Sequence, residues 1–232
     1  MIFGGLQKNS LIDYPGKVSC VIFASGCNFR CPYCHNPELV KGDDGGSARS
    51  NKNGIYDFLE RRKGLLDGVV ISGGEPTLQR NLIRVCDRIK KMGYPVKLDT
   101  NGSRPATVKR LIEDNLIDYI AMDIKTDPFH YSPLFKEDCN PKNILSCVEI
   151  IMGASIGYEF RTTCVRPIVN AKTVIDIVKI IKGAQLYALQ RFHPGQVLDP
   201  RYFNCAEATY NDSEMINLRT LAAPWVQACI VR

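Results

Sequence analysis

The feature of this sequence that most constrains its fold is a regular alternation of strand-like and helix-like segments. Six short runs rich in β-branched and aromatic residues are predicted to be strands: 17–24, 67–74, 95–102, 117–125, 158–165 and 186–193. The amphipathic segments between them are predicted to be helices: 55–66, 77–93, 105–115, 141–155 and 170–183. Strands joined by helical crossovers run parallel. We therefore expect an α/β fold, a parallel sheet with outer helices that forms a partial (β/α)6 TIM-like barrel.

Length and composition limit the classes of protein that this chain can be. Its 232 residues are 45% hydrophobic, enough to bury one large core, so we predict a single domain over residues 1–232, with a polar, glycine-rich loop over 41–54. No long apolar run or secretory leader is visible, which predicts a cytoplasmic protein without a membrane span. The net charge of +6 is spread along the chain rather than gathered in a stripe, so no nucleic-acid partner is expected.

The loop predicted over residues 24–40 carries three closely spaced cysteines, Cys27, Cys31 and Cys34, in a C-x-x-x-C-x-x-C pattern. Ten cysteines in a cytoplasmic chain favour thiols and metal ligands over disulfides. A tetrahedral metal ion or a 4Fe-4S cluster normally takes four protein ligands. Two interpretations stay open on spacing alone: a zinc ion completed by His35 or Cys20, or a cluster with one iron free of protein ligands.

Short polar motifs follow several of the predicted strands, namely "GGEP" (73–76), "LDTNG" (98–102), "MDIK" (122–125) and "QRFHPG" (190–195). In a parallel α/β barrel, active residues lie at the carboxyl ends of the strands. Two glycines let the backbone approach a ligand, Glu75 offers an acceptor for an ammonium group, and Pro76 stiffens the turn. Asp99 and Asp123 also fit helix capping or turn formation. Together the motifs predict one binding site at the mouth of the barrel.

The cysteine triplet, with Tyr33 directly before its last member, resembles the motif of the radical S-adenosylmethionine (radical SAM) superfamily. This resemblance implies an oxidoreductase with a 4Fe-4S cluster on Cys27, Cys31 and Cys34. The amino and carboxylate groups of S-adenosylmethionine would bind the fourth iron. The "GGEP" turn matches the superfamily's motif for the amino group of that cofactor. Reductive cleavage to a 5'-deoxyadenosyl radical would then need no protein base or nucleophile.

From "GLQKNSLIDYPGKVSCVIF" to "RFHPG" the sequence is similar to the family that activates glycyl radical enzymes, and most to activators of anaerobic ribonucleotide reductase. The resemblance implies cofactor-binding roles for Tyr33, Gly73, Gly74, Glu75, Pro76, Asp99, Thr100, Asn101, Asp123, Lys125, Arg161 and His193. It also implies a monovalent cation site at Asp99, Thr100 and Asp123. Without the resemblance, Lys125 and Arg161 would be read as solvated surface charges, and His193 as a residue of the barrel rim.

The resemblance implies that the enzyme removes a hydrogen atom from a glycine of a glycyl radical enzyme, with flavodoxin or ferredoxin as electron donor. One alternative is a radical enzyme that acts on a small molecule, like the 7-carboxy-7-deazaguanine synthases, and another is a non-catalytic zinc-binding module. The segment about 198–232 has no assigned role, nor does Arg166, which departs from the family pattern. The other cysteines are expected to be core or surface thiols: Cys20, Cys86, Cys139, Cys147, Cys164, Cys205 and Cys229.

Overall fold

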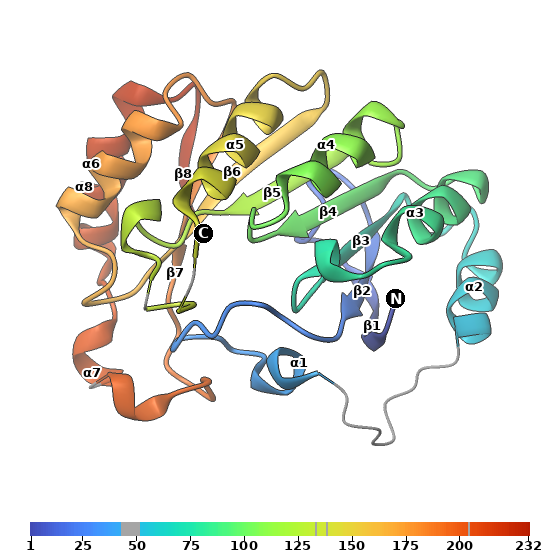
Figure 1. Cartoon of the computed structure of the whole chain (residues 1–232), viewed down its shortest axis with the longest axis horizontal. Coiled ribbons are helices and arrows are strands. Elements are labelled where there is room, and N and C mark those ends of the chain that lie inside the picture. Colours follow the sequence, from blue (N-terminus) through green and yellow to red (C-terminus); the bar gives the residue numbers. More distant parts are fainter. Residues whose placement is uncertain (43–51, 133, 138, 204) are drawn as a thin grey trace. The chain divides into compact units, whose positions relative to one another are not determined.

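The computed structural model describes residues 1–42, 52–132, 134–137, 139–203 and 205–232 (Figure 1). The described chain divides into two compact units: the first contains residues 1–28, 38–100 and 106–120, and the second contains 29–37, 101–105 and 121–232. The single domain over 1–232 stays a prediction. The loop predicted over 41–54 falls mostly on residues 43–51, which lie outside the described residues.

The first unit is built on four strands: β1 (Phe3–Ser10), β2 (Ser19–Ala24), β3 (Gly68–Gly73) and β4 (Val96–Thr100). Strands β2, β3 and β4 are parallel, with Ile22 opposite Ile71 and Ile71 opposite Leu98. These three side chains are fully buried and form part of the core. Strand β1 pairs antiparallel with β2 and was not predicted, because its sequence "FGGLQKNS" contains no β-branched residue.

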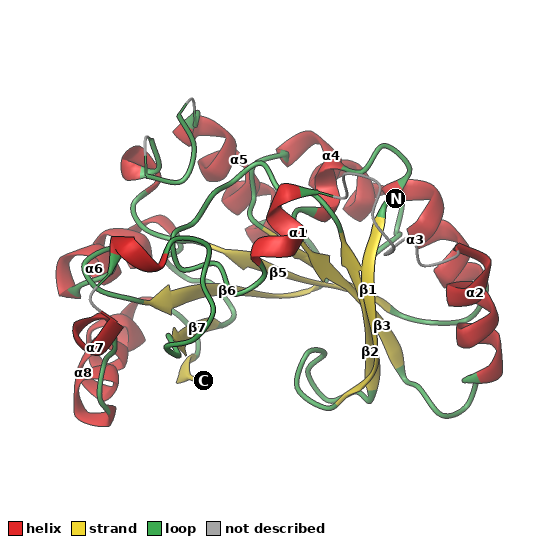
Figure 2. Ribbon diagram, turned by 90° about the horizontal axis from the view of Figure 1, so that it is seen from below, coloured by secondary structure: helices red, strands yellow, loops and turns green. Residues whose placement is uncertain are grey.

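The helices of the first unit are α1 (Pro37–Lys41), α2 (Lys52–Arg61), α3 (Leu82–Lys91) and α4 (Pro105–Glu113). Figure 2 shows α2 and α3 on one side of the strands. Helix α3 buries Leu82, Val85, Cys86 and Ile89, the spacing of one helical face. It begins later than predicted because a 3-10 turn at Pro76–Leu78 precedes it.

Strand β5 (Tyr119–Asp123) crosses the division between the units. The second unit also contains β6 (Gly157–Cys164), β7 (Tyr187–Arg191) and β8 (Cys229–Val231). Strands β6, β7 and β8 are parallel, with Phe160 opposite Tyr187 and Tyr187 opposite Cys229. Strand β8 was not predicted, because three residues are too short to show a periodic pattern. All six predicted strands are present.

The helices of the second unit are α5 (Pro141–Met152), α6 (Ala171–Ile180), α7 (Cys205–Ala208) and α8 (Asp212–Ala222). Helices α6 and α8 lie side by side (Figure 1). Arg166 donates to the carbonyl oxygen of Thr209 at 2.9 Å and pairs with Glu214 at 2.6 Å, so this arginine anchors the start of α8. Within the described residues, no helix is both long and apolar enough to cross a membrane.

Candidate cofactor site

The first part of the cysteine loop belongs to the first unit and is held by backbone hydrogen bonds. Gly26 donates to the carbonyl oxygen of Leu39 at 2.7 Å, and its own carbonyl accepts from the amide of Glu75 at 2.9 Å. Gly26 has a φ of +93°, which a side chain would disfavour. The next residue, Cys27, is half-buried and is not in a disulfide. The glycine therefore directs the chain from β2 toward its first cysteine.

The second part of the loop belongs to the second unit, where Cys31 and Cys34 form a tight turn. The amide of Cys34 donates to the carbonyl oxygen of Cys31 at 3.0 Å, and neither thiol is in a disulfide. Leu198 donates its amide to the carbonyl of Cys34 at 2.9 Å, and Asp199 donates to Pro32 at 3.0 Å. The segment that follows β7 therefore fixes the turn that carries these cysteines, which gives the C-terminal region a structural role.

The two glycines of the "GGEP" turn bring its backbone against the chain that leaves β2. Gly73 has a φ of +109°, and a Cβ there would lie 2.4 Å from the amide nitrogen of Ala24. A Cβ on Gly74 would lie 2.2 Å from the carbonyl oxygen of Gly26. The amide of Gly74 donates to the carbonyl of Ala24 at 2.8 Å. Within the first unit, the close approach that requires glycine is thus to the protein's own backbone.

The Glu75 carboxylate is fully buried in the first unit and accepts several hydrogen bonds there. Its Oε1 atom accepts from the Thr77 amide at 3.0 Å and from the Thr100 hydroxyl at 2.8 Å. The Thr77 hydroxyl donates to the same oxygen. Buried carboxylates are stable only when they are hydrogen-bonded in this way. Glu75 therefore organises the 3-10 turn at Pro76–Leu78, whose N-cap it forms.

Asp99, near the end of β4, has a lysine partner that no sequence motif singled out. Lys97 Nζ lies 2.5 Å from Asp99 Oδ1, and the Lys97 side chain is only 1% exposed. Ser72 donates to Asp99 Oδ2 at 3.1 Å. Positions 97 and 99 lie on the same face of a strand because side chains alternate. The alternation could have revealed this pair, since a charged residue within a buried strand needs a partner.

In the second unit, Asp123, Lys125 and Arg161 form one charged cluster. Asp123 Oδ1 accepts from Arg161 Nε at 2.8 Å, and Asp123 Oδ2 lies 3.4 Å from Lys125 Nζ. Burial opposes ionisation of Asp123, yet the two cations hold its pKa below the usual value. The Lys125 backbone amide donates to the Tyr131 hydroxyl at 2.8 Å, which fixes the end of the strand. Asp123 is therefore shared by two cations, Lys125 and Arg161.

Tyr33 is buried in the second unit, with its ring edge against Phe135 at 6.1 Å between centroids. Burial raises the pKa of its phenol well above the usual value. Among the described residues, the Tyr33 hydroxyl has no hydrogen-bond partner. Asn101 is also buried in this unit, where its side-chain oxygen accepts from the amide of Ser103 at 3.0 Å.

His35 and Cys20, the residues that could complete a zinc site, each have other surroundings. His35 Nε2 donates to the carbonyl oxygen of His193 at 2.9 Å, and its ring stacks on Phe192 at 5.5 Å. The His193 side chain is exposed after β7. Cys20 is fully buried inside β2, and burial raises the pKa of its thiol to about 12. Among the described residues, no group of three His, Cys, Asp or Glu side chains is placed to hold a single metal ion.

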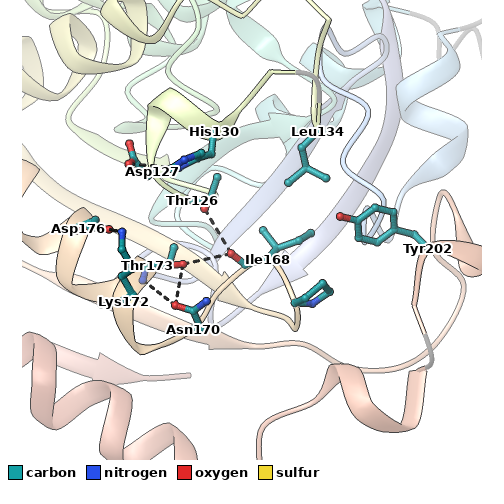
Figure 3. Close-up of a pocket in the computed structure, with 11 residues that line it drawn as sticks. Thr126, Asp127, His130, Leu134, Ile168, Asn170, Lys172, Thr173, Asp176 and Tyr202 are labelled. Atoms are coloured by element: carbon teal, nitrogen blue, oxygen red, sulfur yellow. Dashed lines mark hydrogen bonds and ion pairs between the residues drawn. The ribbon is translucent and has the colours of Figure 1, made fainter.

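The second unit contains a cavity of about 320 Å³, and Figure 3 shows the side chains that line it. Thr126, which follows β5, and Ile168, which follows β6, contribute to its wall. Two pairs lie among its lining side chains: Lys172 pairs with Asp176 at 2.6 Å, and His130 lies 3.4 Å from Asp127. These pairs select no particular class of ligand. The full lining is Thr126, Asp127, His130, Leu134, Pro167, Ile168, Asn170, Lys172, Thr173, Asp176 and Tyr202.

The sequence was compared with known families and proteins. The profile of the radical SAM superfamily matches residues 21–181. The chain belongs to the radical SAM superfamily. A Methanocaldococcus jannaschii protein, named as a candidate glycyl-radical enzyme activating enzyme, is 35% identical over 100% of this chain and 95% of that protein. The pyruvate formate-lyase-activating enzyme of Streptococcus mutans is 25% identical over 78% of this chain and 73% of that enzyme.

Solved structures share the radical SAM fold with this chain. SuiB from Streptococcus suis, bound to S-adenosylmethionine, has a TM-score of 0.68 at 13% identity, covering 90% of this chain and 49% of that protein. Methylornithine synthase has a TM-score of 0.64 at 13% identity, covering 91% of this chain and 63% of that protein. The predicted fold class, an α/β fold of the partial-barrel type, is confirmed, and the protein is a radical SAM enzyme.

Membership of the radical SAM superfamily implies a 4Fe-4S cluster and S-adenosylmethionine, and residues of this chain fit both. Cys27, Cys31 and Cys34 lie on one loop and are not in disulfides, and thiolates are the ligands that iron-sulfur clusters take. The Tyr33 hydroxyl, buried without a partner among the described residues, adjoins the last of these cysteines. The cations Lys125 and Arg161 suit a carboxylate. The three cysteines would hold the cluster.

Proposed function

We propose that this radical SAM enzyme activates a glycyl radical enzyme by removing a hydrogen atom from a glycine α-carbon, and that the partner is an anaerobic ribonucleotide reductase. The observation that carries the proposal is the likeness to the Methanocaldococcus jannaschii candidate activating enzyme, which extends over the whole of this chain. The similarity to a pyruvate formate-lyase-activating enzyme, over 78% of this chain, supports the same class of reaction.

The cofactors, when bound, supply reductive cleavage of S-adenosylmethionine to a 5'-deoxyadenosyl radical. The protein's own residues bind and orient S-adenosylmethionine. Lys125 and Arg161, which share Asp123, would hold the methionyl carboxylate through their positive charges. Buried Tyr33 would border the cofactor and exclude water. The predicted roles of Asn101 and His193 in binding the cofactor remain part of this proposal.

We also propose that an acidic one-electron donor, a flavodoxin or ferredoxin, docks in a groove beside the cysteine turn. This groove, of about 630 Å³ in the second unit, is lined by Arg30, Pro32, Leu134, Leu198, Asp199, Pro200, Arg201 and Tyr202. Arg30 and Pro32 flank Cys31 directly in the sequence. Exposed arginines among apolar side chains are suited to bind an acidic protein surface.

One observation favours a second function, the conversion of a small molecule. The 7-carboxy-7-deazaguanine synthase of Aquifex aeolicus is 34% identical over 103 residues, covering 44% of this chain and 43% of that enzyme. The match is confined to less than half of either protein. It therefore supports the shared cofactor chemistry more than a shared substrate.

Transfer of a hydrogen label distinguishes the two functions. A peptide that copies the partner's glycine loop should speed 5'-deoxyadenosine formation, and deuterium from that glycine's α-carbon should appear in the product. The radical is too reactive to diffuse, so the atom that it takes identifies what was held beside it. The same peptide with alanine in place of the glycine is the control. Label from a deazapurine precursor, with none from the glycine peptide, would instead establish the small-molecule function.

A further inference from the structure

The buried pair of Lys97 and Asp99 bears on the monovalent cation that the family resemblance implies. Lys97 lies in the middle of β4, and its neighbours in the chain, Val96 and Leu98, are fully buried. The Lys97 side chain is 1% exposed and that of Asp99 is 11% exposed. The lysine therefore brings one positive charge to the carboxylate from inside the first unit.

Both carboxylate oxygens of Asp99 have partners from this chain. Oδ1 lies 2.5 Å from Lys97 Nζ, and Oδ2 accepts from the Ser72 hydroxyl at 3.1 Å. The Thr100 hydroxyl, a second expected cation ligand, donates to Glu75 at 2.8 Å. The donors expected to surround an alkali metal ion are thus bound to other groups, and a compact ammonium is already beside the only carboxylate among them in this unit.

The third expected ligand lies in the second unit and has its own cations. Asp123 Oδ1 is 2.8 Å from Arg161 Nε, and Asp123 Oδ2 is 3.4 Å from Lys125 Nζ. Neither carboxylate therefore lacks a counter-charge within its own unit. A further metal cation would have to share each carboxylate with a cation that is tethered at the site.

We propose that the Lys97 ammonium is a built-in replacement for a monovalent metal cation, so that this chain binds S-adenosylmethionine without sodium or potassium. The inference rests on the cofactor-binding part of the proposed function. An ammonium carries the same single charge as these ions and donates directed hydrogen bonds to carboxylates. Because the lysine is tethered to β4, its local concentration does not depend on the salt in solution.

The first experiment measures S-adenosylmethionine binding to the cluster-loaded full chain in potassium, sodium and tetramethylammonium chloride at equal ionic strength. The dissociation constant should agree within about twofold across the three salts. The metal-free chain should show the same melting temperature in each. A several-fold dependence on potassium or sodium in the unaltered protein would overturn the proposal, whether or not any variant folds.

The second experiment removes the tethered cation, the ammonium group of Lys97. In Lys97→Met the Asp99 carboxylate loses the Lys97 ammonium, so the variant should bind S-adenosylmethionine about tenfold more tightly in potassium or sodium than in tetramethylammonium. Without cofactors, the melting temperature of this variant should also be higher in potassium or sodium than in tetramethylammonium. A variant that folds but responds to no cation would contradict the proposal.

Three further variants separate this role from general effects of charge. Lys97→Met combined with Asp99→Asn removes both charges, and should lose the dependence on metal ions. Lys97→Arg keeps the charge and should remain independent of them. Lys91→Met breaks an exposed pair with Asp87 and is the matched control, expected to behave as the unaltered protein. The melting temperature is measured without a partner or turnover. Its result can therefore refute the cation proposal without bearing on the proposed glycine chemistry.

Discussion

The Thr100 hydroxyl at the end of β4 donates to the Glu75 carboxylate beyond β3, with 2.8 Å between Thr100 Oγ1 and Glu75 Oε1. The bond joins two sequence motifs, "GGEP" and "LDTNG", which come from neighbouring parallel strands. Glu75 is fully buried, and Thr77 donates to the same oxygen through its amide. Loss of cofactor binding on mutation of Glu75 would therefore not by itself identify this residue as a ligand.

Glu75→Ala should lower the free energy of unfolding of the metal-free chain by about 2–5 kcal/mol, because it leaves buried donors of Thr77 and Thr100 without an acceptor. Thr100→Val removes one donor to this carboxylate and should cost about 1 kcal/mol. Urea unfolding followed by circular dichroism measures both. A Glu75→Ala protein as stable as the unaltered chain would show that the buried hydrogen bonds contribute little.

Replacing Cys27, Cys31 or Cys34 by alanine, one at a time, should remove most of the 4Fe-4S absorption and all S-adenosylmethionine cleavage after anaerobic reconstitution, because each change deletes a thiolate ligand. The matched controls are Cys86→Ser and Cys147→Ser, whose thiols lie buried in helices α3 and α5. Iron and sulfide analysis gives the result. A full cluster in any of the three loop variants would refute the ligand assignment.

Asp123→Asn should weaken S-adenosylmethionine binding and lower stability at neutral pH by about 1.5–3 kcal/mol, because Lys125 and Arg161 would lose their shared anion. The pKa of Asp123 is lowered in the folded protein, so its contribution is present above the unfolded pKa and is lost as pH falls through the folded pKa. The unfolding free energies of variant and unaltered protein should thus converge in acid, below the ordinary aspartate pKa of 3.8. A difference that stays constant well below a pH of 3.8 would contradict this linkage.

Gly74→Ala should displace the start of the cysteine loop, since the new Cβ would lie 2.2 Å from the Gly26 carbonyl oxygen. The expected result is poor cluster incorporation together with a lower melting temperature. Gly5→Ala is the control in the same unit, because its Cβ would meet only Phe23 at an ordinary 3.6 Å. Equal iron content in the two variants would show that the loop tolerates the shift.

Arg30→Glu should slow reduction of the cluster by an acidic flavodoxin while leaving reduction by dithionite unchanged, because only the protein donor needs the groove. The rate with the unaltered protein should fall as salt is added, since charge pairing at a surface is screened. Lys179→Glu reverses an exposed charge on α6 and is the control. Equal slowing with both reductants would point to damage at the cluster rather than to docking.

The sequence predicted the elements that rest on periodicity, and missed those that rest on contacts distant in the chain. All six strands with β-branched runs are present, whereas β1 and β8 were missed because they owe their conformation to neighbouring strands. Helix α8 was also missed. Its start is set by a capping box between Asn211 and Glu214, and Glu214 also pairs with Arg166, far away in the sequence.

The candidate site likewise has features that the sequence predicted and features that it missed. The motifs named the cysteines, and placed Asp123, Lys125 and Arg161 where the structure joins them in one charged cluster. The burial of Glu75 was not foreseen: two threonines donate to one of its oxygens, and its role toward an ammonium group stays a prediction. Family motifs record which residues recur, but the partners of a buried charge depend on the side chains that surround it.

The bonds from Leu198 and Asp199 to the carbonyl groups of Cys34 and Pro32 have a consequence for how the protein matures. The three cysteines leave the ribosome before the segment that fixes their turn. A nascent chain therefore exposes its thiols before the turn that presents them can be held. Iron delivery is expected after residues 198 and 199 have been synthesised, and a chain truncated before residue 198 would remain a poor recipient even though it contains all three cysteines.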